Sequence, residues 1–214
     1  MTKDVWAIAE AINRARPETD ETDGRVVTSL YRLLGRGKPV TDADLSSVTG
    51  LTKKQIVERV ERWPGVYRDE QGRVIGFWGL SVAEMPPHEI TLDGHKLWAW
   101  CAWDTLFLPR RLGASLDVQS ACPVTGRTIS LRVSPNAVES VEPEDVVVSF
   151  LEPSRPFDAD VIGSFCYYVR FFANRGAGEK WTSEHPGTFL FSLGEAFEIG
   201  RLTDDELLGH VQES

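Results

Sequence analysis

The pattern of apolar residues changes at Pro86-Pro87, and this change limits the folds open to a chain of 214 residues. Before it, apolar residues recur at the spacing of amphipathic helices, whereas after it short strand-like runs are separated by turn signals. A chain of this length forms one large domain or two modest ones. The sequence therefore predicts an α+β fold, with a winged-helix-like helical domain over residues 1–80 and a mixed β-sheet domain with short helices over residues 81–214.

The first 80 residues carry the signals of a winged-helix domain. They predict four helices, of which Thr41 or Asp42 caps the third and Thr52 caps the fourth, followed by two short strands around a turn at residues 69–72. Winged helices commonly bind DNA, and the alternative is a scaffold or lid that keeps the shape alone. Because Glu58 and Glu61 dilute the basic residues of the fourth helix, we expect the scaffold.

Charge and cysteine content exclude several classes of protein. The net charge of −9 argues against a general nucleic-acid binder, since residues 1–80 hold 13 basic and 12 acidic side chains and residues 81–214 hold 10 and 20. No apolar run approaches the roughly 20 residues of a membrane span, and the N-terminus lacks the layout of a secretory signal. Three cysteines are too few for a disulfide framework. We expect a cytoplasmic protein with free thiols and no membrane or nucleic-acid partner.

The second domain is predicted from short runs rich in β-branched and aromatic residues. The expected strands cover residues 88–92, 95–100, 116–119, 128–133, 146–151 and 164–172. Short helices or helical turns are expected over residues 134–138, 179–184 and 193–202.

The most informative stretch, residues 97–107, runs from a predicted strand into a predicted helix with Cys101 at the junction. The unpaired amides and the dipole of a helix N-terminus favour a thiolate, so we expect a lowered pKa at Cys101. Asp104 follows three residues later, on the same helix face, so that a thiol and a carboxyl group face one site. The alternative is that Cys101 is a small buried apolar residue and Asp104 only a partner of the helix dipole.

Several aromatic residues flank this pair, namely Trp98, Trp100, Trp103 and Phe107. Aromatic residues in such a cluster most often belong to the core, but they also line apolar ligand pockets. The sequence leaves both interpretations open.

The other two cysteines lie far along the chain from this stretch. Cys166 lies in the run of residues 164–172, where strand alternation would place Cys166, Tyr168 and Arg170 on one face that borders a site. A strand cysteine is also commonly structural. Cys122 precedes a proline in a predicted hairpin turn, and we interpret it as structural.

Several segments together resemble the bacterial organomercurial (alkylmercury) lyases. They are Trp100-Cys101-Ala102-Trp103-Asp104, the turn from Cys122 to Gly126, and Ser164-Phe165-Cys166. The resemblance in order and spacing extends from the N-terminal helical domain to Gly194-Glu195-Ala196-Phe197. The pattern W-C-A-x-D with a distant S-F-C is far more specific than any single cysteine.

The resemblance implies roles for individual residues. Cys101 matches the family's first catalytic cysteine, Asp104 its catalytic aspartate and Cys166 its second catalytic cysteine, and all three would contact the mercury of substrate and product. Cys122 matches a cysteine assigned to structure. The family's N-terminal domain is winged-helix-like but does not read DNA. Trp103 departs from the family pattern, because a smaller apolar residue is more usual there, and it puts the substrate range in doubt.

The chemistry explains why these residue types are needed. Mercury(II) is a soft ion and thiolates are soft ligands, so we expect capture by cysteine. A second thiolate makes the bound carbon more basic, and Asp104, whose charged form is disfavoured among aromatic rings, supplies the proton. We expect protonolysis of organomercurials in mercury detoxification, without an organic cofactor. Low-molecular-weight thiols, or a mercuric reductase as the resemblance suggests, would then take the product Hg²⁺.

Two other functions stay open at this stage. One is a winged-helix regulator that senses mercury or thiols, which requires a basic recognition surface. The other is a cysteine hydrolase that pairs Cys101 with a histidine base. The available histidines are His88, His95, His185 and His210.

Overall fold

A computed structural model of the chain describes residues 3–208, and for residues 205–208 it describes the backbone alone. The helices are α1 (Val5–Ala15), α2 (Glu21–Leu34), α3 (Asp42–Thr49), α4 (Lys53–Val60), α5 (Asp104–Leu112), α6 (Val161–Ser164), α7 (Arg175–Glu184), α8 (Leu193–Leu208) and the 3-10 helix η1 (Cys166–Tyr168). The strands are β1 (Val66–Arg68), β2 (Val74–Phe77), β3 (Leu80–Ser81), β4 (His88–Leu92), β5 (His95–Ala99), β6 (Leu116–Ala121), β7 (Thr128–Val133), β8 (Val138–Glu142), β9 (Val147–Leu151), β10 (Phe171–Phe172) and β11 (Thr188–Ser192). The α+β fold class is thus confirmed.

Helices α3 and α4 begin where their capping residues, Thr41 and Thr52, predict. The Thr41 side chain accepts a hydrogen bond from the Asp44 N–H, and the Asp44 carboxylate accepts one from the Thr41 N–H. Thr52 and Gln55 form the same reciprocal pair at the start of α4. Each capping box satisfies amides that the first turn of a helix leaves without partners.

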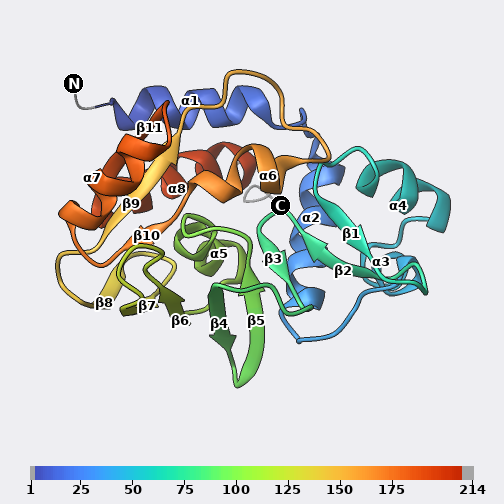
Figure 1. Cartoon of the computed structure of the whole chain (residues 1–214). Helices are drawn as coiled ribbons and strands as arrows, with labels where there is room; N and C mark the ends of the chain where they lie inside the picture. Colours follow the sequence, from blue (N-terminus) through green and yellow to red (C-terminus); the bar gives the residue numbers. More distant parts are fainter. Residues whose placement is uncertain (1–2, 209–214) are drawn as a thin grey trace.

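Most strands belong to an eight-stranded sheet in the order β1-β2-β3-β5-β4-β6-β7-β8. Its pairs are all antiparallel in the described part of the chain. Figure 1 shows the β1–β2 hairpin beside α2 and α4, and β6 to β8 on the other side of the molecule. Because β3 joins the hairpin to β5, the predicted boundary at residue 80 falls inside one continuous sheet, and the division into two domains there stays a prediction.

A second, three-stranded sheet has the order β10-β9-β11, and the segment that leads into β10 differs from the sequence-based prediction. The predicted strand over residues 164–172 is wrong, because this segment holds the end of α6, then η1, then the two residues of β10. Tertiary hydrogen bonds override the periodicity here, since the Val169 carbonyl accepts the Ala102 N–H at 3.1 Å and the Ser149 hydroxyl accepts the Arg170 N–H at 3.0 Å. The helical turn predicted over residues 134–138 is also absent, and β8 begins at Val138.

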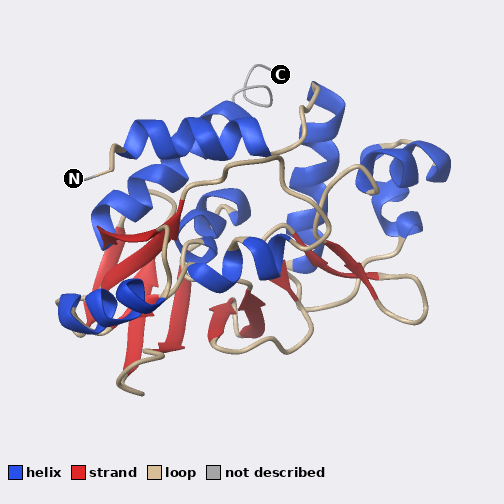
Figure 2. Cartoon of the chain, turned by 45° about the horizontal axis from the view of Figure 1, so that its top comes forward, coloured by secondary structure: helices blue, strands red, loops and turns tan. Residues whose placement is uncertain are grey.

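Helix α5 lies at the centre of the fold and presents its first residue, Asp104, to the interior. It contacts α2, α8, β6 and β7, so that helices and the large sheet enclose it. Figure 2 shows α1 and the helices near it on one side of the strands. No helix within residues 3–208 is long and apolar enough to cross a membrane.

A buried polar network ties three helices to the turn after β2. Arg111 of α5 donates to the Asp204 carboxylate of α8 at 2.7 Å and to the Tyr31 hydroxyl of α2 at 2.9 Å. The Tyr31 hydroxyl in turn donates to the Trp78 carbonyl at 2.7 Å. The hydrogen bond from Arg111 to Tyr31 helps to offset the cost of removing this ion pair from water.

Replacing Tyr31 with phenylalanine is expected to lower the free energy of unfolding by about 1–3 kcal/mol, because it leaves a buried guanidinium donor and the Trp78 carbonyl without their partner. Chemical denaturation followed by circular dichroism measures this change. The control is Tyr67→Phe, which removes only a long 3.5 Å hydrogen bond to the Ala159 carbonyl and should change stability by less than about 0.5 kcal/mol. Equal effects of the two substitutions would contradict the structural importance of the network.

Candidate functional site

Cys101 and Asp104 lie in the turn that connects β5 to α5. Asp104 is the first residue of the helix, and its carboxylate accepts the Cys101 N–H at 2.7 Å. The Thr105 hydroxyl donates to the Ala102 carbonyl at 2.8 Å and closes the same turn. The Asp104 side chain is therefore directed back toward Cys101, as a capping carboxylate would be.

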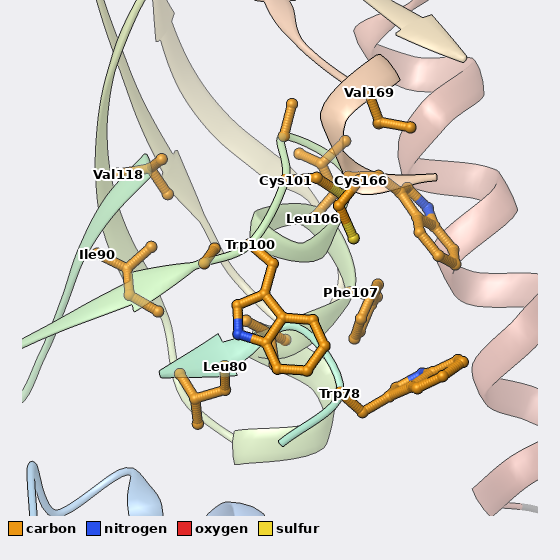
Figure 3. Close-up of a cluster of buried hydrophobic side chains, with 14 of the residues drawn as sticks. Trp78, Leu80, Ile90, Trp100, Cys101, Leu106, Phe107, Val118, Cys166 and Val169 are labelled. Carbon is orange, nitrogen blue, oxygen red and sulfur yellow. The ribbon is translucent and has the colours of Figure 1, made fainter. Parts of the chain in front are cut away.

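Cys166 approaches this turn from a segment more than sixty residues further along the chain. It opens η1, and its carbonyl accepts the Val169 N–H at 3.1 Å. The Val169 carbonyl accepts the Ala102 N–H, so a backbone hydrogen bond links the two cysteine-bearing segments directly. Figure 3 shows Cys101 and Cys166 next to each other, with Val169 close by.

The structure thus brings together the three residues that the sequence selected. One ligand atom from each of Cys101, Asp104 and Cys166 lies within 4.8 Å of the others. All three are buried, with exposed fractions of 0% for Cys101, 5% for Asp104 and 4% for Cys166. Two sulfurs and a carboxylate at such separations can bind one soft metal ion together. Their chemical roles stay a prediction at this point.

A small cavity of about 20 Å³ adjoins these residues. Its lining consists of Trp78, Gly79, Trp100, Trp103, Asp104, Phe157, Val161, Phe165 and Cys166. Such a volume holds about one water molecule. Of the aromatic residues that the sequence suggested as a pocket, Trp100 and Trp103 line the cavity, whereas Trp98 and Phe107 do not. Trp78, Phe157 and Val161 were not anticipated, because they come from distant segments that carry no motif.

Gly79 lines the cavity at a position that favours glycine over any other residue. Its φ angle is +93°, a left-handed conformation that side chains disfavour. A Cβ atom at this position would lie 2.7 Å from Oδ1 of Asp104. The absence of a side chain therefore lets the backbone of residue 79 pack directly against the carboxyl group.

The surroundings of the Asp104 carboxyl group disfavour its charged form. Burial raises its pKa from 3.8 to about 7, against the lowering effects of hydrogen bonds with Cys101 and of the positive charge of Arg111. This agrees with the expectation that the aromatic surroundings disfavour the charged form. A carboxyl group with a pKa near neutrality is suited to both accepting and donating a proton.

The thiols are also held in their neutral forms, and the predicted lowering of the Cys101 pKa is wrong. Burial raises the pKa of Cys101 well above its ordinary value, and the neighbouring Cys166 and Asp104 add to the effect. Helix α5 begins only at Asp104, so Cys101 lies before the helix and gains little from its dipole. At Cys166 the hydrogen bond with Cys101 lowers the pKa, but burial and the charge of Asp104 raise it more.

Cys122 lies outside this cluster, in the loop between β6 and β7. Its N–H donates to the Arg127 carbonyl at 2.9 Å, and its carbonyl accepts the Gly126 N–H at 2.9 Å. The side chain is buried and does not line the cavity. This location fits the interpretation of Cys122 as a structural residue.

The residues needed for the alternative functions lie elsewhere. Among the described residues, no histidine lines the cavity: His88 is buried against Ser120, His95 is exposed and His185 is stacked on Trp181. His210 lies outside the described residues. In the helix that would read DNA, Arg59 pairs with Asp20 and Asp23, and Lys54 pairs with Glu58. These ion pairs neutralise much of the basic charge of α4.

Comparisons with known proteins agree along nearly the whole chain. A family model described as "Alkylmercury lyase" matches residues 80–203, and one described as "Helix-turn-helix domain of alkylmercury lyase" matches residues 9–78. The alkylmercury lyase of Pseudomonas putida is 38% identical to this chain, and the alignment covers 97% of this chain and 96% of the relative. The alkylmercury lyase of Bacillus cereus is 36% identical, and the alignment covers 91% of this chain and 90% of the relative. A solved structure, "Crystal structure of the mercury-bound form of MerB2", shares the fold with a TM-score of 0.72 at 24% identity, covering 96% of this chain and 100% of that one.

Replacing Asp104 with asparagine is expected to stabilise the protein increasingly as the pH rises from about 4 to 7. In this range the unfolded carboxyl ionises while the folded one keeps its proton, so the wild type loses stability with rising pH. Asparagine cannot ionise and still accepts the Cys101 N–H. The gain should reach on the order of 4 kcal/mol above pH 7 and vanish near pH 4. Urea unfolding at both pH values measures it, and a gain that does not depend on pH would show that the carboxyl is ionised in the folded protein.

Proposed function

The chain belongs to the alkylmercury lyase family of enzymes, and on that premise we propose that Cys101, Asp104 and Cys166 cleave the carbon–mercury bond by protonolysis. The observation that carries the proposal is the convergence of two sulfurs and a carboxylate within 4.8 Å, in a site withdrawn from water. Residues 81–214 would form the catalytic domain, and residues 1–80 a winged-helix-like scaffold.

The first step is capture of the organomercurial by a thiol. A substrate R–Hg–X, where X is an external thiolate, exchanges X for one of the two cysteine sulfurs, and the displaced X leaves with the thiol proton. Mercury prefers sulfur ligands, and metal binding drives deprotonation of a thiol whose pKa is otherwise raised. The raised pKa values of Cys101 and Cys166 keep both thiols protonated until mercury arrives.

The second step uses the carboxyl group of Asp104 as a proton shuttle. Its carboxylate form accepts the proton of the second thiol, and that sulfur joins the mercury atom. Two thiolates then donate electron density to mercury and make the bound carbon more basic. Asp104 delivers its proton to this carbon, so that R–H leaves, Hg²⁺ stays between Cys101 and Cys166, and the carboxylate is regenerated. Because its pKa lies near 7, Asp104 can act in both directions at neutral pH.

The third step is release of the metal. Hg²⁺ leaves by exchange onto external thiols, which are either low-molecular-weight thiols or those of a mercuric reductase, and the cysteines regain their protons. This sequence of steps needs no organic cofactor, since thiols and a carboxyl group supply every proton and ligand. A cytoplasmic location would supply the reduced thiols that it consumes.

Replacing Cys101 or Cys166 with alanine is expected to abolish release of benzene from phenylmercury, because each substitution removes one of two sulfur ligands. Cys122→Ala should keep the turnover per folded molecule and lose only stability, by about 1–3 kcal/mol, since it deletes a buried side chain away from the cavity. Gas chromatography of the product in excess external thiol measures the activity. Full turnover by a folded Cys166→Ala protein would contradict the two-thiolate mechanism.

The Asp104→Asn protein should still bind organomercury but release hydrocarbon at least about a hundredfold more slowly, because the amide cannot carry the proton. Native mass spectrometry should show the protein with an intact R–Hg group attached, and a change in the hydrocarbon-release rate is read by gas chromatography. A variant that forms no adduct would assign Asp104 to substrate capture instead of proton transfer.

A further inference from the structure

The reaction site as the structure holds it is too small for the substrate. The cavity of about 20 Å³ accommodates roughly one water molecule, and Cys101 and Cys166 have almost no exposed surface. An aryl or alkyl group on mercury needs several times this volume. The site must therefore open, and a neighbouring surface groove that shares a lining residue with the cavity indicates where.

A surface groove of about 500 Å³ lies against one side of the cavity. It is lined by the end of α1, the segment from Glu61 to Tyr67, and residues 156–159 of the loop that joins β9 to α6. Figure 1 shows this orange loop passing alongside α1 before it reaches α6. Both polar and apolar side chains line the groove, as suits a molecule with an organic group at one end and a polar thiol ligand at the other.

Aromatic side chains separate the groove from the cavity: Trp63 of the groove packs on Trp78 of the cavity, and Tyr67 of the groove packs on Trp100 of the cavity. Among the described residues, Phe157 is the one that lines both spaces. Its ring makes edge contacts with Trp78 at 5.4 Å and Phe165 at 5.2 Å between centroids, and both of these residues line the cavity. Beside it, Gly65 of the groove has no side chain, and a Cβ there would lie 2.7 Å from the Trp100 ring.

The loop that carries Phe157 is built to move with little disturbance of the core. Residues 152–160 form no helix or strand, and most of their side chains are exposed. The Phe157 N–H donates to the Ala15 carbonyl at 2.8 Å, and the Tyr67 hydroxyl reaches the Ala159 carbonyl at 3.5 Å. Moving the ring breaks its contacts with Trp78 and Phe165 but leaves the hydrogen bonds around Cys101 and Cys166 intact. Segments of this kind open locally at low free energy.

From this geometry, and resting on the proposed lyase function, we propose that organomercury thiolates reach the sulfurs through this groove and that Phe157 is the gate. While the gate is closed, the Phe157 ring keeps bulk water out of the cavity. To admit the organic group, the ring swings toward the groove. Phe157 is thus a specificity-determining residue, because the space that it vacates limits the size of the group that enters.

The test measures access without requiring any lyase activity. In mercury-free protein, the rate at which methyl methanethiosulfonate labels Cys101 and Cys166 is followed by peptide mass spectrometry. Phe157→Ala should raise this rate by about tenfold or more, and Phe157→Leu, which keeps an apolar side chain, by less. In the same variants, kcat/KM for phenylmercury should rise relative to that for methylmercury. Circular dichroism checks that each variant is folded. If Phe157→Ala does not fold, the Phe157→Leu variant still tests the proposal.

The matched control is Tyr167→Ala, which removes a 45% exposed ring directly beside Cys166 but away from the groove. The proposal expects labelling of the wild type and of this variant to be equal. Faster labelling in the Tyr167 variant, or unchanged labelling in both Phe157 variants, overturns the gate. Faster labelling in the Phe157 variants supports the gate even if the protein cleaves no organomercurial, so failure of the gate and failure of the lyase function are distinguishable.

Discussion

The removal of three ionisable groups from water, without a permanent opposite charge between them, determines how this site behaves. Cys101, Asp104 and Cys166 are all buried, and burial raises the pKa of each thiol and of the carboxyl. The buried cation that acts on Asp104, Arg111, is already paired with Asp204 and bonded to Tyr31, and Arg170, which acts on Cys166, is only half-buried. In the empty site the two thiols therefore keep their protons, and an arriving mercury cation supplies the charge that lets them ionise.

The fold maintains this arrangement by joining segments that are distant in sequence. The hydrogen bond from the Ala102 N–H to the Val169 carbonyl fixes the two cysteine segments to each other. Helix α5 presents Asp104 at its first position, and Gly79 closes over the carboxyl group from the other side. The Tyr31 hydroxyl donates to the carbonyl of the preceding residue, Trp78, so the N-terminal helices are bonded directly to a turn that lines the cavity. The winged-helix-like part therefore contributes to the surroundings of the candidate site.

The sequence predicted the local elements well and the long-range ones poorly, for a physical reason. The capping boxes at Thr41 and Thr52 are local interactions between residues three positions apart, so their helices could be placed in advance. The conformation of Cys166 depends on a hydrogen bond to a segment more than sixty residues away, and its aromatic neighbours resemble a strand. The pairing of Cys101 with Asp104 was visible because it spans a single turn. The aromatic residues next to Asp104 in the sequence also indicated that its charged form is disfavoured, but they did not reveal Trp78 and Phe157, which line the same cavity from other segments.

The aromatic residues that line the cavity link substrate size to proton transfer. Trp103 packs edge-on against Phe107, Phe150 and Phe165 and lines the cavity beside Asp104. Its bulk reduces the space for an organic group, and it also excludes water from the carboxyl. A smaller residue would admit larger groups, but it would admit water as well and return the pKa of Asp104 toward 3.8. A movable gate at Phe157 resolves this conflict, because it lets the cavity be wide during binding and dry during protonation of the carbon.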